Sequence, residues 1–142
     1  MSETLPIHDL LIRRISSKQD ALATRWVAIQ DGDHLLRRFG LAEVVRAEPD
    51  RQPFLQLRSS ADEVWTLIEG QVEFRWLDLR AGSPTQDQEH RFICDNPTLV
   101  LAPFGVAFGV RPLEGSALLL RLATHADGTH EGDRRLAWED PA

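Results

Sequence analysis

The sequence predicts an all-β fold, built as a sandwich or barrel of short antiparallel strands. Val72, Phe74 and Trp76 alternate with polar side chains, which is the period of a half-buried strand. The preceding run, residues 64–68, is rich in β-branched and aromatic side chains and ends just before Gly70, which predicts a hairpin turning at this glycine. Short runs of similar length recur along the chain, and such regular spacing is typical of sandwiches and barrels.

Further strands are predicted on both sides of this hairpin. Upstream, residues 25–30 and 41–47 flank an Asp-Gly-Asp turn at residues 31–33, so they are predicted to be strands joined by that turn. Turns that contain proline or glycine separate the runs that follow the hairpin. These downstream strands are predicted at residues 90–94, 98–102, 106–111 and 117–124.

Residues 17–26 fit two different structures. Ser17 and Asp20 are placed to cap a short helix over residues 21–26, and a strand through residues 26–29 fits equally well.

The whole chain, residues 1–142, is expected to form one domain. Its parts are an N-terminal extension of strands or a short helix (1–40), a barrel (41–125) and a C-terminal tail (126–142).

Composition narrows the possible functions. A length of 142 residues suits one domain with one core. The net charge of −6 argues against a nucleic-acid partner or an anionic membrane surface, although a local basic pocket is compatible with it. The single cysteine excludes an internal disulfide and a Cys-rich zinc site. Neither a signal peptide nor a membrane-spanning apolar stretch is evident, so we expect a cytoplasmic protein.

Three segments in order resemble one enzyme family. They are residues 67–72 followed by the run Asp-Leu-Arg-Ala-Gly-Ser-Pro-Thr at 78–85, residues 102–109, and residues 136–141. Together these segments make residues 51–141 similar to the dTDP-4-dehydrorhamnose 3,5-epimerases. The resemblance implies a cupin jelly roll (a double-stranded β-helix barrel), a homodimer, metal-independent chemistry and a sugar-nucleotide ligand in the barrel.

The resemblance also implies that no metal is bound. The cupin metal site uses three histidines and a glutamate, a ligand set that suits Fe, Mn or Zn. In this chain those positions fall on Gln56, Arg58, Glu63 and Phe108, so one ligand of the four is kept. Arg58 cannot ligate, because its guanidinium is permanently charged and has no acceptor. We therefore expect neither a metal nor another cofactor.

Most of the family's catalytic residues are replaced. Epimerisation beside a ketone needs a base on one face and an acid on the other. By the resemblance, the base histidine has become Phe54, the lysine Glu63 and an aspartate Phe74, and the chain contains no tyrosine to serve as the acid. Asp140 matches the aspartate that orients the base, but the base itself is missing. Classical 3,5-epimerase activity is therefore not expected.

Four residues are candidates for ligand binding, each with a structural alternative. Arg51 and Gln56 match the family, where the arginine holds a phosphate; the alternative is a solvated loop arginine beside Asp50. Arg58 is predicted to pair with Glu63 inside the barrel, which would mark a ligand site; otherwise both are surface charges. Trp65 points to the same face as Glu63, where it stacks on a sugar or simply fills the core.

Three functions remain open at this stage. The first is a relative of the epimerases that binds a sugar nucleotide without the classical reaction. The second is an isomerase for a different sugar, with Glu63 as the base and His125 as the acid. The third is a structural or interaction protein whose barrel is filled by three phenylalanines, Phe54, Phe74 and Phe108. Arg75, on the face opposite Phe74, is expected to be exposed unless a partner chain covers it.

Overall fold

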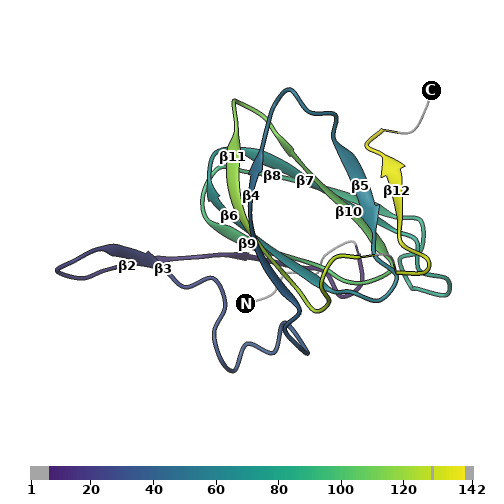
Figure 1. The fold of residues 1–142 in the computed structure, drawn as a ribbon, viewed down its shortest axis with the longest axis horizontal. Helices are drawn as coiled ribbons and strands as arrows, with labels where there is room; N and C mark the ends of the chain where they lie inside the picture. Colours follow the sequence, from purple (N-terminus) through teal and green to yellow (C-terminus); the bar gives the residue numbers. More distant parts are fainter. Residues whose placement is uncertain (1–6, 129, 140–142) are drawn as a thin grey trace.

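Two five-stranded antiparallel sheets face one another and form the body of the molecule (Figure 1). The computed structural model describes residues 7–128 and 130–139; these residues form strands and no helix, so none of them forms a helix able to cross a membrane. The all-β prediction is confirmed. The strands are β1 (Leu11–Arg14), β2 (Ser17–Gln19), β3 (Thr24–Trp26), β4 (Leu41–Ala47), β5 (Phe54–Leu57), β6 (Glu63–Glu69), β7 (Val72–Asp78), β8 (Glu89–Cys94), β9 (Thr98–Ala102), β10 (Val106–Pro112), β11 (Ala117–Ala123) and β12 (Arg134–Ala137).

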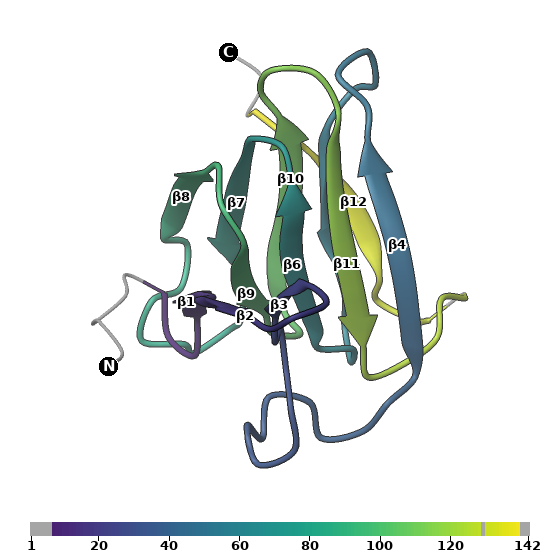
Figure 2. The same ribbon diagram turned by 90° about the vertical axis from the view of Figure 1, so that its left-hand side faces the viewer.

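The first sheet has the order β1-β9-β6-β11-β4 and the second β12-β5-β10-β7-β8. The core between them contains Leu67, Val72, Phe74 and Trp76, all fully buried. The alternation over 70–78 therefore predicted the inward face of β7 correctly. The edge strands β4, of the first sheet, and β12, of the second, lie on the same side of the molecule (Figure 2).

The turn at Gly70 is present, but the predicted hairpin is wrong. β6 belongs to the first sheet and β7 to the second, so the chain crosses between sheets at this turn instead of pairing the two strands. Gly70 has a φ of +107°, and a Cβ there would lie 2.8 Å from the Cα of Ala117. A glycine is needed because both the backbone conformation and the close approach of β11 exclude a side chain.

The N-terminal region contains a hairpin and no helix. Asp20 Oδ1 accepts hydrogen bonds from the backbone N–H groups of Leu22 and Ala23, which closes the turn between β2 and β3. The helix alternative over 21–26 is therefore wrong, because the aspartate caps a turn, and the strand that forms is Thr24–Trp26 instead of 26–29. The strand predicted over 25–30 is limited to β3, which pairs with β2, whereas the strand predicted over 41–47 is present as β4 and pairs with β11. The β2–β3 hairpin projects away from the two sheets (Figure 1).

Both ends of the described chain add a strand to the sheets. β1 pairs with β9, and β12, which lies within the predicted tail, pairs with β5. Trp138, just after β12, packs with Leu55 and Ala107 on the outer face of the second sheet. This segment covers Arg75, whose side chain is 2% exposed, so the expectation of an exposed Arg75 is wrong. The chain's own C-terminal segment supplies the cover.

A buried aspartate organises the turn after β7. Asp78 accepts hydrogen bonds from the side chains of Arg80, Ser83 and Thr85. Burial opposes the ionisation of Asp78, but these hydrogen bonds outweigh it and keep the pKa of Asp78 well below its ordinary value. The Asp-Leu-Arg-Ala-Gly-Ser-Pro-Thr run is thus a turn held together by its own side chains.

Candidate functional site

An open pocket of about 660 Å³ lies between the sheets on the side of β4 and β12. Its walls come from β4, β5, β6, β10, β11 and β12 and from the loops that follow β4 and β11. The third hypothesis required a barrel filled by phenylalanine. Phe74 and Phe108 are buried as that hypothesis expected, but Phe54 is 39% exposed and lines the pocket, so the interior is only partly filled.

β5 supplies one wall through its alternation. Phe54, Gln56 and, just beyond the strand, Arg58 line the pocket, whereas Leu55 is buried in the cluster on the outer face. Successive side chains of a strand point to opposite faces, so this short segment delivers one aromatic, one amide and one guanidinium group to the same cavity. Gln56 Nε2 donates to the backbone oxygen of Arg134, which ties β5 to β12.

A cluster of charges closes one end of the pocket; we call Arg58, Glu63, Arg121 and Asp127 the inner cluster, of which the first three are buried and Asp127 is exposed. Arg58 Nη1 donates to Glu63 Oε2 at 2.8 Å and to Asp127 Oδ1 at 3.2 Å. The predicted Arg58–Glu63 pair is therefore present inside the barrel. Arg121 Nε donates to Glu63 Oε2 at 3.1 Å, and its Nη1 and Nη2 donate to Asp127.

Arg121 was not identified from the sequence, although a signal was present. It interrupts the apolar run of β11, where a charged residue with the inward parity of Leu119 has to find partners. It also donates to Glu43 Oε1 at 3.1 Å, so it links β11 to its neighbour β4. The hydrogen bond from the Arg121 guanidinium holds the pKa of Asp127 below its ordinary value.

Aromatic side chains form the wall beside the inner cluster. Trp65 is half-buried, lines the pocket and donates from Nε1 to Glu63 Oε1 at 3.0 Å. Its ring centroid lies 5.7 Å from that of Phe108, which in turn stacks on Phe74 in the core. The predicted common face of Trp65 and Glu63 is confirmed. One tryptophan thus contacts both the charged and the apolar part of the interior.

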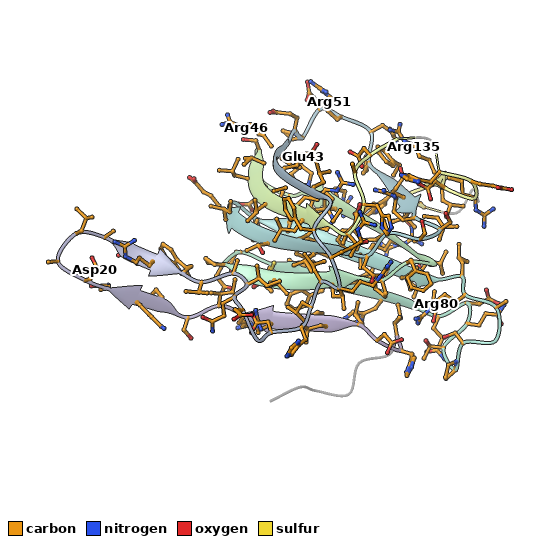
Figure 3. The ribbon with its side chains drawn as sticks, turned by 60° about the horizontal axis from the view of Figure 1, so that its bottom comes forward. Asp20, Glu43, Arg46, Arg51, Arg80 and Arg135 are labelled. Carbon is orange, nitrogen blue, oxygen red and sulfur yellow. The ribbon has the colours of Figure 1, made fainter. Side chains whose placement is uncertain are left out.

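Two arginines stand at the mouth of the pocket. Arg51 is 78% exposed, and its Nε lies 3.7 Å from Asp50 Oδ1, so it is the loop arginine of the structural alternative and lines the pocket as well. Arg135, on β12, lies over the ring of Phe54 at 4.1 Å. Figure 3 shows Arg51 and Arg135 far from the hairpin that carries Asp20. Glu48 also lines the pocket.

Solved structures with the same architecture are sugar-nucleotide enzymes. A dTDP-4-dehydrorhamnose 3,5-epimerase from Bacillus anthracis str. Ames, solved with TDP and PPi bound, superposes with a TM-score of 0.83 at 16% identity, over 99% of this chain and 85% of that one. A dTDP sugar isomerase from Desulfovibrio desulfuricans G20 gives a TM-score of 0.81 at 16% identity, over 94% and 87%. The fold is a cupin jelly roll.

A curated relative is similar in sequence. The spore coat polysaccharide biosynthesis protein SpsL of Bacillus subtilis (strain 168) is 28% identical over 116 residues, which cover 79% of this chain and 77% of that protein. No protein-family model matches the chain.

The cupin jelly roll brings most of the predicted ligand-binding residues together. Arg51, Gln56, Arg58 and Trp65 all line the pocket, as does Glu63. Gln56, Arg58 and Phe108 stand where the resemblance places three cupin metal ligands. Within the described residues, no three His, Cys, Asp or Glu side chains are grouped to hold a metal ion.

One predicted catalytic residue, His125, is not brought into this site. His125 lies outside the set of described residues that line the pocket, and its Nδ1 lies 2.8 Å from Thr124 Oγ1. Desolvation and the nearby Arg38 and Arg37 lower the pKa of His125. Asp140 lies outside the described residues, so its predicted role stays a prediction.

Proposed function

We propose that this protein binds a sugar nucleotide in the open pocket without carrying out classical 3,5-epimerisation. The observation that carries the proposal is a buried charged cluster directly beside an open cavity. Taking charged groups out of water costs several kcal/mol each, and ion pairing returns only part of that cost. Such clusters are concentrated at functional sites, where a bound ligand can offset the part of the desolvation cost that the ion pairs leave.

The mouth of the pocket suits a diphosphate. Arg51 and Arg135 approach it from the β4–β5 loop and from β12, and Arg51 forms only a long, exposed ion pair with Asp50, at 3.7 Å. Guanidinium groups recognise phosphate through paired N–H donors. In this arrangement the diphosphate lies between the two arginines and the sugar extends toward Trp65 and the inner cluster.

The comparisons support this choice of ligand. The B. anthracis epimerase holds TDP and PPi, and the D. desulfuricans protein is an isomerase of dTDP sugars. SpsL is named for polysaccharide biosynthesis, a process in keeping with a sugar-nucleotide ligand. The proposed biological setting is therefore the making of a surface polysaccharide, in the cytoplasm.

The replaced side chains are the reason to propose a loss of the classical reaction. Phe54 lines the pocket where the resemblance places the base, and a phenyl ring cannot accept a proton. An enolate beside Glu63 would meet a negative charge instead of a lysine. The isomerase alternative, with Glu63 and His125 as base and acid, is less favoured because His125 does not line the pocket.

Isothermal titration calorimetry with dTDP and dTDP-glucose tests the proposal. We expect both nucleotides to bind with a stoichiometry of one per chain, and inorganic phosphate at the same concentration to bind much more weakly. The absence of heat from either nucleotide at millimolar concentration would refute the proposal. A parallel assay for proton exchange at a dTDP-4-keto sugar should show no turnover.

We also propose that two copies of the chain form a homodimer through the projecting β2–β3 hairpin. Leu22 is 85% exposed on this hairpin, Trp26 is exposed at the end of β3, and Val27 is exposed just after it. Exposed apolar side chains on a projecting two-stranded ribbon are typical of a protein–protein contact. Light scattering should give twice the chain mass, and Leu22→Asp with Trp26→Asp should give a monomer; a monomeric wild-type protein would refute this part.

A further inference from the structure

We infer that the inner end of the pocket selects an uncharged sugar through its hydroxyl groups and rejects a sugar acid. This inference rests on the proposed function, because it concerns the sugar attached to the nucleotide. It comes from the hydrogen-bonding groups that remain open in the inner cluster and from the balance of charge around them.

Arg58 has a buried donor without a hydrogen-bond partner. Its side chain is 8% exposed and lines the pocket. Nη1 is engaged by Glu63 and Asp127, but Nη2 is buried and has no hydrogen-bond partner among the described residues. Nε lies 3.2 Å from Asp133 Oδ2, but the N–H group does not point at this oxygen, so Nε also makes no hydrogen bond. A buried unsatisfied donor is costly, so an acceptor on a bound ligand would relieve this cost.

Glu63 offers an acceptor in the same place. Its Oε2 is fully used by the two arginines, whereas Oε1 accepts one hydrogen bond, from Trp65 Nε1. A carboxylate oxygen has room for two hydrogen bonds, so Oε1 retains one site. Arg58 thus has a donor without a partner, and Glu63, its ion-pair partner, has an acceptor position without one. Together they match a hydroxyl group, which both accepts and donates.

The charge balance argues against a carboxylate on the sugar. Asp133 and Glu43 also contact the arginines of the inner cluster, so four carboxylates surround two guanidinium groups. A uronic acid would place a fifth negative charge in this partly buried space, where charges interact more strongly than in water. The half-buried Trp65 provides an apolar face against which the C–H groups of a neutral sugar ring can pack.

Three ligands that differ only beyond the diphosphate test the inference: dTDP, dTDP-glucose and dTDP-glucuronate, titrated into the full chain. We expect dTDP-glucose to bind at least tenfold more tightly than dTDP-glucuronate and more tightly than dTDP. Equal or tighter binding of the glucuronate would overturn the inference. Since this comparison uses the wild-type protein, it does not depend on whether a variant folds.

Two variants locate the effect. Arg58→Lys keeps the charge beside Glu63 but removes the unpaired guanidinium nitrogen Nη2, so dTDP-glucose should lose its advantage over dTDP. Glu63→Gln removes one negative charge, so the discrimination against glucuronate should shrink. Unchanged preferences in a folded Arg58→Lys variant would contradict the role of Arg58.

The titrations also separate the inference from the proposed function. If dTDP binds but dTDP-glucose and dTDP-glucuronate bind equally well, the inner end is not selective and only the inference fails. If dTDP does not bind at all, the proposed function fails, and the inference fails with it.

Discussion

The two halves of the space between the sheets are built from different side chains. Beside β7, β8 and β9 the interior is dry and apolar, with Phe74 and Trp76 fully buried. Beside β4, β5 and β12 the same two sheets enclose an open pocket with Arg58, Glu63 and Arg121 at its inner end. The packed half therefore uses side chains that stabilise a fold, and the open half uses side chains that burial penalises.

This difference indicates that the two halves serve different purposes. Apolar burial contributes roughly 25 cal/mol per Å² and is the main source of folding free energy. A buried ion pair, by contrast, is often no better than apolar side chains of similar volume. The inner cluster is thus expected to contribute little to stability and to exist for what it binds.

The largest expected effect is the loss of a packed aromatic ring. Trp76 is 0% exposed and also donates from Nε1 to the backbone oxygen of Leu101. Trp76→Ala should lower the free energy of unfolding by about 3 to 5 kcal/mol, through lost transfer energy and a cavity. Urea denaturation measures this, with Ile93→Ala, an exposed position on β8, as the control at about 0.5 kcal/mol or less. A loss below 1 kcal/mol for Trp76→Ala would show that this half is not the main core.

Breaking the inner cluster and replacing it should have opposite effects. Glu63→Ala leaves Arg58 and Arg121 buried with fewer partners, and should cost about 3 kcal/mol of unfolding free energy. The triple replacement of Arg58 by Met, Glu63 by Leu and Arg121 by Met should bring stability back to within about 1 kcal/mol of wild type, or above it. Urea denaturation of both variants decides the point. A triple variant as unstable as Glu63→Ala would mean that the charges are structural.

The buried Asp78 differs from the buried charges of the inner cluster, because its hydrogen bonds come from side chains of its own turn. Its pKa is lowered on folding, so it contributes stability that is present above the unfolded pKa of about 4 and is lost as pH falls toward the folded pKa. The contribution at pH 7 should be about 2 to 3 kcal/mol. Unfolding measured from pH 7 to pH 3 should therefore show falling stability, and Asp78→Asn should flatten this slope. An unchanged slope would show that other groups control the acid limb.

The smallest effect is expected at the mouth of the pocket. Arg51→Ala and Arg135→Ala should each weaken dTDP binding about tenfold, since each removes one guanidinium from the proposed diphosphate position, and should change stability by less than about 0.5 kcal/mol. Calorimetry measures the affinity, and Arg14→Ala, on β1, is the control that should bind as wild type does. Wild-type affinity in the Arg51 or Arg135 variant would show that the substituted residue does not contribute to dTDP binding.

The sequence predicted those features that depend on local pattern. The alternation of β7 identified its inward face, and the common parity of Trp65 with Glu63 placed both in one cavity. The pairing of strands was not predictable in this way, because it depends on distant segments. β6 and β7 join different sheets although one short turn links them, and β4 finds its partner in β11.

The candidate site was predicted only in part, because some of its contacts join residues that are far apart in the sequence. The family resemblance places both Arg58 and Glu63 at positions that face the interior of the barrel, so their pairing could be predicted. Arg121 is 58 residues from Glu63, and no spacing rule connects them. The burial of Arg75 was missed because Trp138, which covers it, comes from a segment interpreted as a tail.

In the proposed binding mode, the ligand enters the open half and leaves the packed half unchanged. The indole N–H groups of Trp65 and Trp76 report on the two halves separately, since Trp65 lines the pocket and Trp76 is buried on the other side. Because the chain has four tryptophans, the two signals in a ¹H–¹⁵N correlation spectrum are assigned with Trp65→Phe and Trp76→Phe. On addition of dTDP-glucose, the Trp65 signal should shift with ligand concentration and the Trp76 signal should stay in place. A Trp65 signal that does not move at saturating ligand would contradict the account.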